Sequence, residues 1–169
     1  MIKDYTSFID FIKTGRLGPL DFQVSKTSLI DILGRPKSIY DSYRGEKDKP
    51  EILTYHYKNL EIIFYDSEPL YISVGFDSRK AGLPKELQIS WHKSAKKLFL
   101  GDFVNILKTE NITCERLHQP ALIGENAVLW LPQGRIDVRF LIETDLRIWN
   151  ITAVSKNISH GRWETSECF

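Results

Sequence analysis

The chain has little cysteine and no long apolar run. Its two cysteines, Cys114 and Cys168, stand far apart in 169 residues. Small disulfide-bonded domains carry more cysteines at closer spacing, so we expect two free thiols. No apolar run approaches the roughly 20 residues that cross a bilayer. Residues 1–7 also lack the basic start, apolar run and cleavage site of a signal peptide, and we expect a soluble cytoplasmic protein with no membrane partner.

The chain also lacks an excess of either charge. Lys and Arg number 23, Asp and Glu number 22, and the net charge is +1. Proteins that bind nucleic acid usually present a basic face, so this balance predicts no nucleic-acid partner. The hydrophobic fraction of 42% and the aromatic fraction of 12% are sufficient for a packed core. The length fits one domain, or two small halves that share a core.

The sequence motifs of common enzymes are missing. There is no Gly-x-Ser-x-Gly elbow, no phosphate-binding loop and no dinucleotide-binding glycine fingerprint. The four histidines do not stand at the spacing of a metal motif. His118 does follow Cys114 closely enough to form a pair of metal ligands, or a thiol and its base, but a surface histidine is the simpler interpretation. We therefore expect no catalytic residues, no metal, no cofactor and no enzymatic activity.

The clearest pattern that is present alternates apolar and polar residues at 59–65, and it recurs at 135–141. Each segment places three apolar residues on one face, which is typical of a strand with one covered side. The same distance along the chain separates the two sets, which are Leu60, Ile62 and Phe64 in the first segment and Ile136, Val138 and Phe140 in the second. The constant offset predicts tandem halves.

Local signals predict the helices. Ser25 is a good N-cap and Gly34 a good C-terminal stop for a helix between them. A shorter amphipathic helix covers residues 5–12 and ends at Gly15. In the second half, a helix starts at Ser94 or at Asp102.

Alternation predicts the strands. They are expected at 52–57, 60–65, 70–76 and 87–91, and then at 128–131, 135–142 and 146–154. The fold class is therefore α+β, an antiparallel sheet with helices packed on one face, arranged as two helix–meander halves in tandem. The first half covers residues 1–93 and the second 94–155, and the halves share one core. Residues 156–169 form a loosely ordered tail that can dock Trp163 or Phe169.

The first half also carries a longer motif. It reads Leu17-Gly-Pro-Leu, then Ser25-x-x-x-Leu29-x-x-x-Leu33-Gly34-x-Pro36, then Tyr55-x-Tyr57 and Leu60-x-Ile62-x-Phe64. This motif resembles the repeat unit of the β-lactamase-inhibitor-protein-like and SmpA/OmlA-like folds over residues 17–76. Residues 100–154 resemble it only in their hydrophobic pattern.

The resemblance implies a tandem fold that presents a concave sheet to a protein partner. Similar small cytoplasmic proteins are bacterial immunity proteins, encoded beside secreted toxins. The chain departs from both families, because it lacks the secretory signal and lipid-attachment cysteine of the outer-membrane proteins and the paired cysteines of the secreted inhibitors. The motif is structural, so the resemblance implies no site residues.

The sheet face that points away from the helices is the predicted binding surface. If Leu60, Ile62 and Phe64 point inward, their neighbours point outward. The predicted partner-binding residues are Ile63, Tyr65, Arg139, Leu141 and Trp149, although the ambiguous register of its strand allows Trp149 on either face. Tyr, Trp and Arg are typical of binding hot spots. Leu129 and Leu131 join this face if Trp130 points inward.

These residues favour a non-enzymatic protein-binding module, above all an immunity or inhibitor protein that blocks a toxin or an enzyme through its sheet face. The expected partner is a protein, such as a cognate bacterial toxin, and the chain is a monomer or a homodimer. One alternative is an assembly subunit that dimerises through the sheet. Another is a small-ligand carrier or enzyme with a pocket between sheet and helices. Glu61 and Asp137 would form the acid–base pair of such an enzyme, but two solvent-facing carboxylates are the simpler interpretation.

Overall fold

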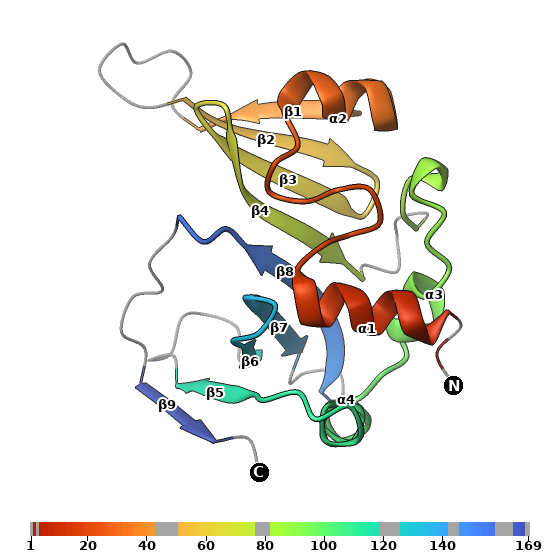
Figure 1. Ribbon diagram of the computed structural model, residues 1–169, viewed down its shortest axis with the longest axis vertical. Coiled ribbons are helices and arrows are strands. Elements are labelled where there is room, and N and C mark those ends of the chain that lie inside the picture. Colours follow the sequence, from red (N-terminus) through yellow and green to blue (C-terminus); the bar gives the residue numbers. More distant parts are fainter. Residues whose placement is uncertain are drawn as a thin grey trace.

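The computed structural model describes residues 2, 4–42, 51–76, 82–118, 126–141, 146–157 and 164–167. These residues form one nine-stranded antiparallel sheet with helices along one face (Figure 1). The predicted α+β class is confirmed. In the described part of the chain, no helix combines the length and the apolar content that a membrane-spanning helix needs.

The helices and strands follow one another in a similar order in the two halves. The first half contains α1 (Tyr5–Thr14), α2 (Lys26–Leu33), β1 (Ser38–Asp41), β2 (Ile52–Tyr57), β3 (Leu60–Tyr65) and β4 (Glu68–Gly75). The second half contains a 3-10 turn, η1 (Lys85–Leu87), then α3 (His92–Ala95), α4 (Leu100–Thr109), β5 (Glu115–His118), β6 (Asn126–Leu131), β7 (Ile136–Leu141), β8 (Arg147–Val154) and β9 (Glu164–Glu167).

The strand order across the sheet is β1-β2-β3-β4-β8-β7-β6-β5-β9. Two meanders therefore meet through their last strands, β4 and β8, where Ser73 pairs with Thr152. The pairing register shifts between Ile63 and Phe64 in the first meander, and between Arg139 and Phe140 in the second. These shifts fall at the positions that the offset of the predicted repeat makes equivalent. The tandem repeat itself stays a prediction.

The ends of α1 and α2 follow from local chemistry. Ser25 Oγ accepts a hydrogen bond from the Ser28 backbone N–H at 3.0 Å, and this N-cap satisfies a donor that the first turn leaves free. Gly15 and Gly34 end the helices with φ of 71° and 75°. That left-handed backbone costs glycine little, so both predicted helices stop where expected.

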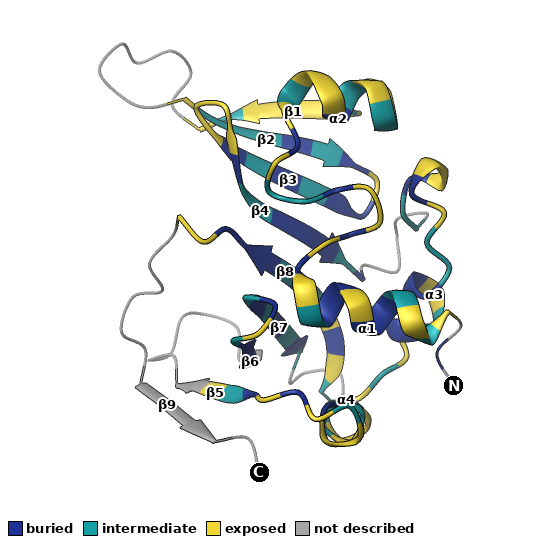
Figure 2. Cartoon of the chain, viewed as in Figure 1, coloured by how far each residue is buried: buried dark blue, intermediate teal, exposed yellow. Residues whose placement is uncertain are grey.

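The core lies between the sheet and the helices. The inward residues of β3 and β7 are fully buried, and the side chains between them are only partly buried or exposed, as predicted (Figure 2). One hydrophobic cluster contains these residues together with Phe8 of α1, Leu29 of α2 and Phe103 of α4. Because both halves contribute to it, the helices of each half help to bury the sheet of the whole chain.

The strand predicted at 87–91 is wrong. Leu87 ends η1, Gln88 has a left-handed φ of 54°, and Trp91 is the N-cap residue of α3. Leu87 and Trp91 are buried all the same. The indole of Trp91 stacks on the Phe11 ring of α1, with ring centroids 5.8 Å apart. The apolar alternation here therefore reflects packing against a helix and not a place in the sheet.

Two edge strands were missed in the sequence. Every residue of β1 is exposed or half-buried, so β1 has no apolar alternation to reveal it. At the opposite edge, β9 pairs with β5, so part of the predicted loose tail belongs to the sheet. Trp163 and Phe169, the residues expected to dock, lie outside the described residues.

The expectation of two free thiols is also wrong, because Cys114 is disulfide-bonded. Cys114 is buried directly before β5, whose first residue, Glu115, pairs with Glu167 of β9. Cys168, the only other cysteine in the sequence, follows Glu167 and lies outside the described residues. The sequence argument failed because it judged spacing along the chain, whereas pairing of β5 with β9 joins distant segments.

Gly134, between β6 and β7, lies against the end of α1. A Cβ atom on Gly134 would lie 2.2 Å from the carbonyl oxygen of Ile12, so Gly134→Ala forces backbone atoms apart. We expect this substitution to lower the free energy of unfolding by about 1–3 kcal/mol. Urea unfolding followed by circular dichroism measures the loss.

Gly101 in α4 provides the matched control. A Cβ atom there meets no other atom within 4 Å. Alanine also favours a helix over glycine, so Gly101→Ala should leave stability unchanged or raise it by up to about 1 kcal/mol. Equal effects of the two substitutions would contradict the close contact between Gly134 and α1.

Candidate functional site on the outer face of the sheet

The outer face of the sheet, opposite the helices, is ordered in rows of cross-strand partners. One row runs across five neighbouring strands, from β3 to β6. Its members are Glu61, Ser73, Thr152, Asp137 and Trp130. Because all five are paired in register, their side chains leave the sheet on the same side.

The middle of this face is polar. Ser73 Oγ lies 3.0 Å from Thr152 Oγ1, and the Asn150 amide donates to Ser73 Oγ at 2.7 Å. The Thr152 hydroxyl in turn donates to Asn150 Oδ1 at 2.5 Å. These three side chains, which we call the polar seam, connect β4 to β8 where the two meanders meet. The seam satisfies its own hydrogen bonds and fixes the register of that joint.

Two of the predicted binding residues lie on one side of the polar seam. Ile63 is half-buried on β3, and Tyr65 at the end of the same strand has 42% of its surface exposed. Arg139 and Leu141 lie on β7, on the other side of the seam, and both are half-buried. Since β4 and β8 lie between β3 and β7, three strand spacings of about 4.8 Å separate the two groups by about 14 Å.

Trp149 belongs to the β7 side. Arg139 pairs with Asn150 and Phe140 with Ile148, so Trp149 is the extra residue of a bulge in β8. Its indole is 39% exposed. A bulge frees a side chain from the regular alternation of a strand, which explains why the sequence could not assign Trp149 to a face. In the register of the sheet, Trp149 thus stands next to Asn150, the partner of Arg139, whereas Ile63 and Tyr65 lie two strands away on β3.

The Arg139 guanidinium has unused hydrogen-bonding capacity. Its Nε atom is buried and finds no acceptor among the described residues. A buried donor without an acceptor costs about 1–3 kcal/mol. A carbonyl or carboxylate oxygen that approaches this part of the outer face would remove that cost.

A small apolar cluster on the same face was missed in the sequence. Val128, Trp130 and Val154 are buried here and pack with Tyr71, separately from the main core. The Arg135 guanidinium lies over the Trp130 ring, 5.8 Å from its centroid. Trp130 thus points outward, and Leu129 and Leu131 point inward, contrary to the possibility raised by the sequence. Alternation in β4 could have identified Tyr71 and Ser73, but only the pairing of β4 with β8 places them at the centre.

The outer face does not bring Glu61 and Asp137 together. Ser73 and Thr152 stand between them in the row, which again corresponds to about 14 Å. The paired carboxylates of glycosidases are only about 5–10 Å apart. Glu61 Oε1 instead lies 3.2 Å from Nδ1 of His56. The acid–base pair considered from the sequence is therefore excluded.

Cys114 and His118 do not form a thiol and its base, because Cys114 is disulfide-bonded and has no free thiol. A disulfide sulfur is neither a thiolate nucleophile nor a good metal ligand. Across the described ranges, no three His, Cys, Asp or Glu side chains are grouped so that they could hold a metal ion. The chemistry that the outer face supports is hydrogen bonding and aromatic contact.

No protein-family model, curated protein or solved structure matches this chain. The resemblance of residues 17–76 to the inhibitor-type folds therefore stays a prediction.

Proposed function

We propose that this protein is a non-enzymatic binding module of the immunity or inhibitor type, which blocks a toxin or an enzyme through the outer face of its sheet. The observation that carries the proposal is the exposed indole of Trp149 beside Arg139, whose Nε lacks an acceptor. Tryptophan and arginine dominate binding energy at protein interfaces. Tyr65 offers a second exposed aromatic ring on the same face.

The size of this surface fits one protein partner. The distance of about 14 Å from β3 to β7 is well within a patch of about 800 Å² per partner, the usual size of a specific interface. The polar seam lies between the two groups, and its hydroxyl and amide groups hydrogen-bond to one another. We infer a partner that places an oxygen acceptor at Arg139 and apolar atoms on Trp149 and Tyr65.

The double substitution Tyr65→Ala and Arg139→Ala tests both ends of this surface. The partner to use is the protein encoded by the reading frame next to this gene, because immunity proteins are encoded beside their toxins. We expect isothermal titration calorimetry to show a loss of affinity of about a hundredfold, since two hot-spot side chains are removed. The melting temperature should barely change, because neither side chain belongs to the main core.

The control replaces two exposed arginines in the loops that follow α1 and α2. Arg16→Ala with Arg35→Ala removes arginine side chains from the helical side of the molecule and should leave partner binding unchanged. Unchanged affinity in the Tyr65 and Arg139 variant, or a collapsed fold, would overturn the site assignment. A constitutive homodimer in light scattering, broken by the same double substitution, would instead support the assembly subunit.

The cytoplasmic location predicted from the sequence stays a prediction, and the disulfide at Cys114 weighs against it. Disulfides persist in oxidising compartments and are rare in the cytoplasm. An inhibitor that meets its target outside the cytoplasm would fit both the disulfide and the proposed function. Thiol labelling of the protein in its native cells would decide between the two locations.

A further inference from the structure

A cavity of about 1080 Å³ lies on the helical side of the molecule. It is open to solvent and is lined by the N-terminal end of α1, the segment before α3, α3 itself and α4. Its apolar wall consists of Ile2, Leu83, Ile89, Leu98 and Ile106. Cavities that bind small molecules are mostly apolar and measure about 300–1,000 Å³, so this one has the size and the lining of such a site.

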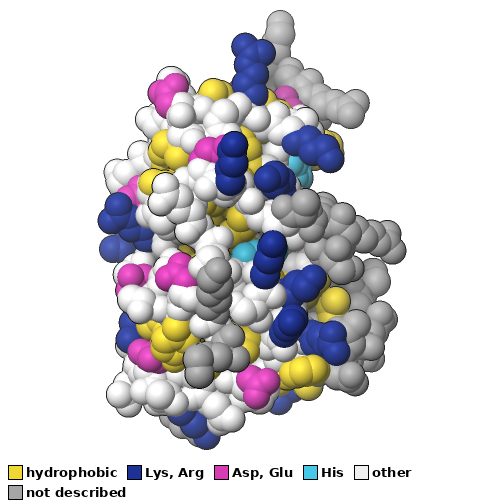
Figure 3. Space-filling model, turned by 90° about the vertical axis from the view of Figure 1, so that its right-hand side faces the viewer, with side chains coloured by type: hydrophobic (Ala, Val, Ile, Leu, Met, Phe, Trp, Pro, Cys, Tyr) yellow, Lys and Arg dark blue, Asp and Glu magenta, His cyan; other side chains and the backbone are white. Residues whose placement is uncertain are grey.

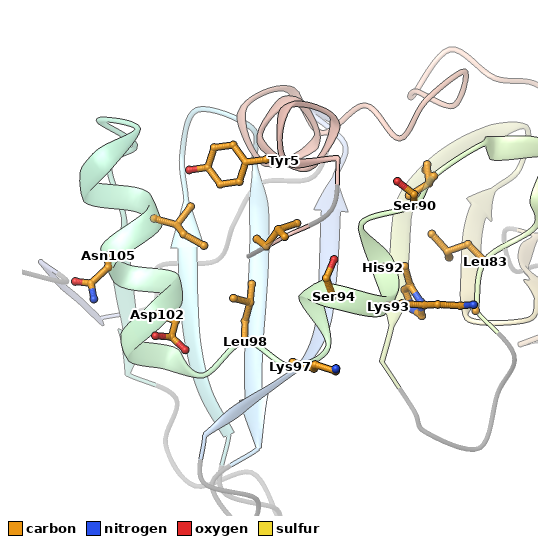
Figure 4. Close-up of a pocket in the computed structure, with 14 residues that line it drawn as sticks. Tyr5, Leu83, Ser90, His92, Lys93, Ser94, Lys97, Leu98, Asp102 and Asn105 are labelled. Atoms are coloured by element: carbon orange, nitrogen blue, oxygen red, sulfur yellow. The ribbon is translucent and has the colours of Figure 1, made fainter.

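Polar side chains line the cavity on both sides. Figure 4 shows His92 and Lys93 on one side, Asp102 and Asn105 of α4 across from them, and Ser94 and Lys97 between the two groups. In Figure 3, hydrophobic atoms and a histidine lie among Lys and Arg side chains on the same side of the molecule. The cavity thus has an apolar body and a polar, basic rim, which are the two parts of an amphipathic site.

His92 is the buried polar group of this site. It is 5% exposed, and its ring stacks on Phe76 with centroids 4.9 Å apart. Its Nε2 lies 2.8 Å from the Gly75 carbonyl oxygen. A carbonyl only accepts hydrogen bonds, so Nε2 carries the hydrogen and donates it. Burial lowers the pKa of His92 below its ordinary value, which keeps the ring neutral at pH 7.

The other ring nitrogen of His92, Nδ1, therefore carries no hydrogen and can only accept a hydrogen bond. Nδ1 is buried and has no hydrogen-bond partner among the residues that the structure describes. A buried acceptor left in this state costs about 1–3 kcal/mol. Because His92 lines the cavity, a ligand whose hydroxyl or N–H group reaches Nδ1, with a small shift of the side chains that cover this atom, would remove the cost, whereas a purely apolar ligand would not.

Lys93 and Lys97 supply positive charge at the rim. Both are exposed, and neither forms a salt bridge with another described residue. Asp102 is the only acidic residue in the described lining, so the rim has a net positive charge. Two ammonium groups near a mostly apolar cavity favour a ligand whose charged end is an anion.

We propose that this cavity binds an amphipathic hydroxy acid, with its alkyl chain against the apolar wall, its carboxylate at Lys93 and Lys97, and its hydroxyl donating to Nδ1 of His92. The site lies on the opposite side of the sheet from the outer face, and its occupant does not depend on the protein partner. It also differs from the pocket considered in the sequence, because its described lining comes from helices and the segments that join them and not from the strands of the sheet.

Isothermal titration calorimetry with three ten-carbon probes measures separately what the hydroxyl and the negative charge of the ligand contribute to binding. 3-Hydroxydecanoate has all the required groups, decanoate lacks the hydroxyl, and decane-1,3-diol lacks the charge. We expect 3-hydroxydecanoate to bind, and each of the other probes to bind about 3–10-fold more weakly, the value of one lost hydrogen bond. No binding of 3-hydroxydecanoate, or equal affinity for all three probes, would overturn the proposal.

Substitutions in the cavity lining test whether the probes bind there. Lys93→Gln with Lys97→Gln should weaken 3-hydroxydecanoate about tenfold and leave decane-1,3-diol unchanged. The control pair, Lys37→Gln with Lys156→Gln, removes the same charge from exposed positions that do not line the cavity and should change neither probe. Equal losses in both pairs would show that only net charge matters and would overturn the site. Ile106→Trp, which fills the cavity, should abolish binding of every probe.

This outcome is separable from the proposed function. The Tyr65 and Arg139 variant should bind 3-hydroxydecanoate as the unaltered protein does, and the Lys93 and Lys97 variant should bind the protein partner normally. Failure of the hydroxy acid to bind would contradict only the proposed ligand of the cavity. Failure of the protein partner to bind would contradict only the proposed function of the outer face.

Discussion

Trp91→Ala should lower the free energy of unfolding by about 3–5 kcal/mol, the usual cost of emptying a large buried aromatic site. Trp91 is fully buried and is surrounded by aromatic rings. It stacks on Phe11 and meets Phe8 edge-on, with centroids 5.2 Å apart. These contacts join α1 to the start of α3, so their loss should loosen both helices. Domains are stable by only about 5–15 kcal/mol, and the variant should therefore unfold at a much lower urea concentration.

Two companion variants isolate the cause. Trp91→Phe keeps an aromatic ring and removes an indole N–H that has no acceptor among the described residues, so it should cost clearly less than the alanine variant. Trp149→Ala removes the same side chain from an exposed position and should change stability by no more than about 0.5 kcal/mol. If Trp91→Ala and Trp149→Ala unfold at the same urea concentration, the packing described for Trp91 is wrong.

Trp91 also shows where inference from the sequence reached its limit. Helix α2 could be predicted because its signals are local: a serine that caps and a glycine that stops. The strands β3 and β7 could be predicted because each buries one face against helices. The segment at 87–91 has the same alternation, but a helix and not a sheet buries it. Periodicity reveals that a segment has a covered side, and it does not reveal what covers it.

The candidate site was predictable in part for the same reason. Alternation correctly placed Ile63, Tyr65, Arg139 and Leu141 away from the inward residues of β3 and β7. It could not show that β4 and β8 separate them, because the pairing of distant strands depends on contacts across the whole sheet. For this reason, the sequence did not predict the polar seam or the His92 cavity. Ser73 and Thr152 are 79 residues apart, and His92 reaches its acceptor at Gly75 through the fold alone.

The cavity and the outer face lie on opposite sides of the same sheet. The helices bury one side of the sheet and also line the His92 cavity, while the outer face that we propose as the partner surface lies on the other side. The joint between β4 and β8 holds both regions in one structure, since Gly75 at the end of β4 accepts from His92 and also pairs with Asn150. A single sheet therefore positions both of the binding surfaces that we propose.

Reduction of the disulfide at Cys114 should lower the free energy of unfolding by about 2–4 kcal/mol, because a disulfide limits the conformations of the unfolded chain. Cys114 is buried directly before β5, and β5 pairs with β9 at the edge of the sheet. We expect dithiothreitol to lower the urea midpoint and to remove the hydrogen-exchange protection of residues 164–167 before that of β3 or β7. The edge strand β9 should open first, because it pairs with only one strand, whereas the central strands each pair with two.

Cys114→Ala tests the bond without a reductant, and comparison with the reduced protein separates two effects. The variant loses the bond and a buried sulfur, whereas the reduced protein loses only the bond, so the variant should be the less stable of the two. Iodoacetamide should label no cysteine in the unfolded, unreduced protein. Labelling of both cysteines, with a urea midpoint unchanged by dithiothreitol, would mean that the thiols are free and would restore the cytoplasmic prediction. Absence of labelling would confirm the disulfide, a bond that is rare in the cytoplasm, and would weigh against the cytoplasmic prediction.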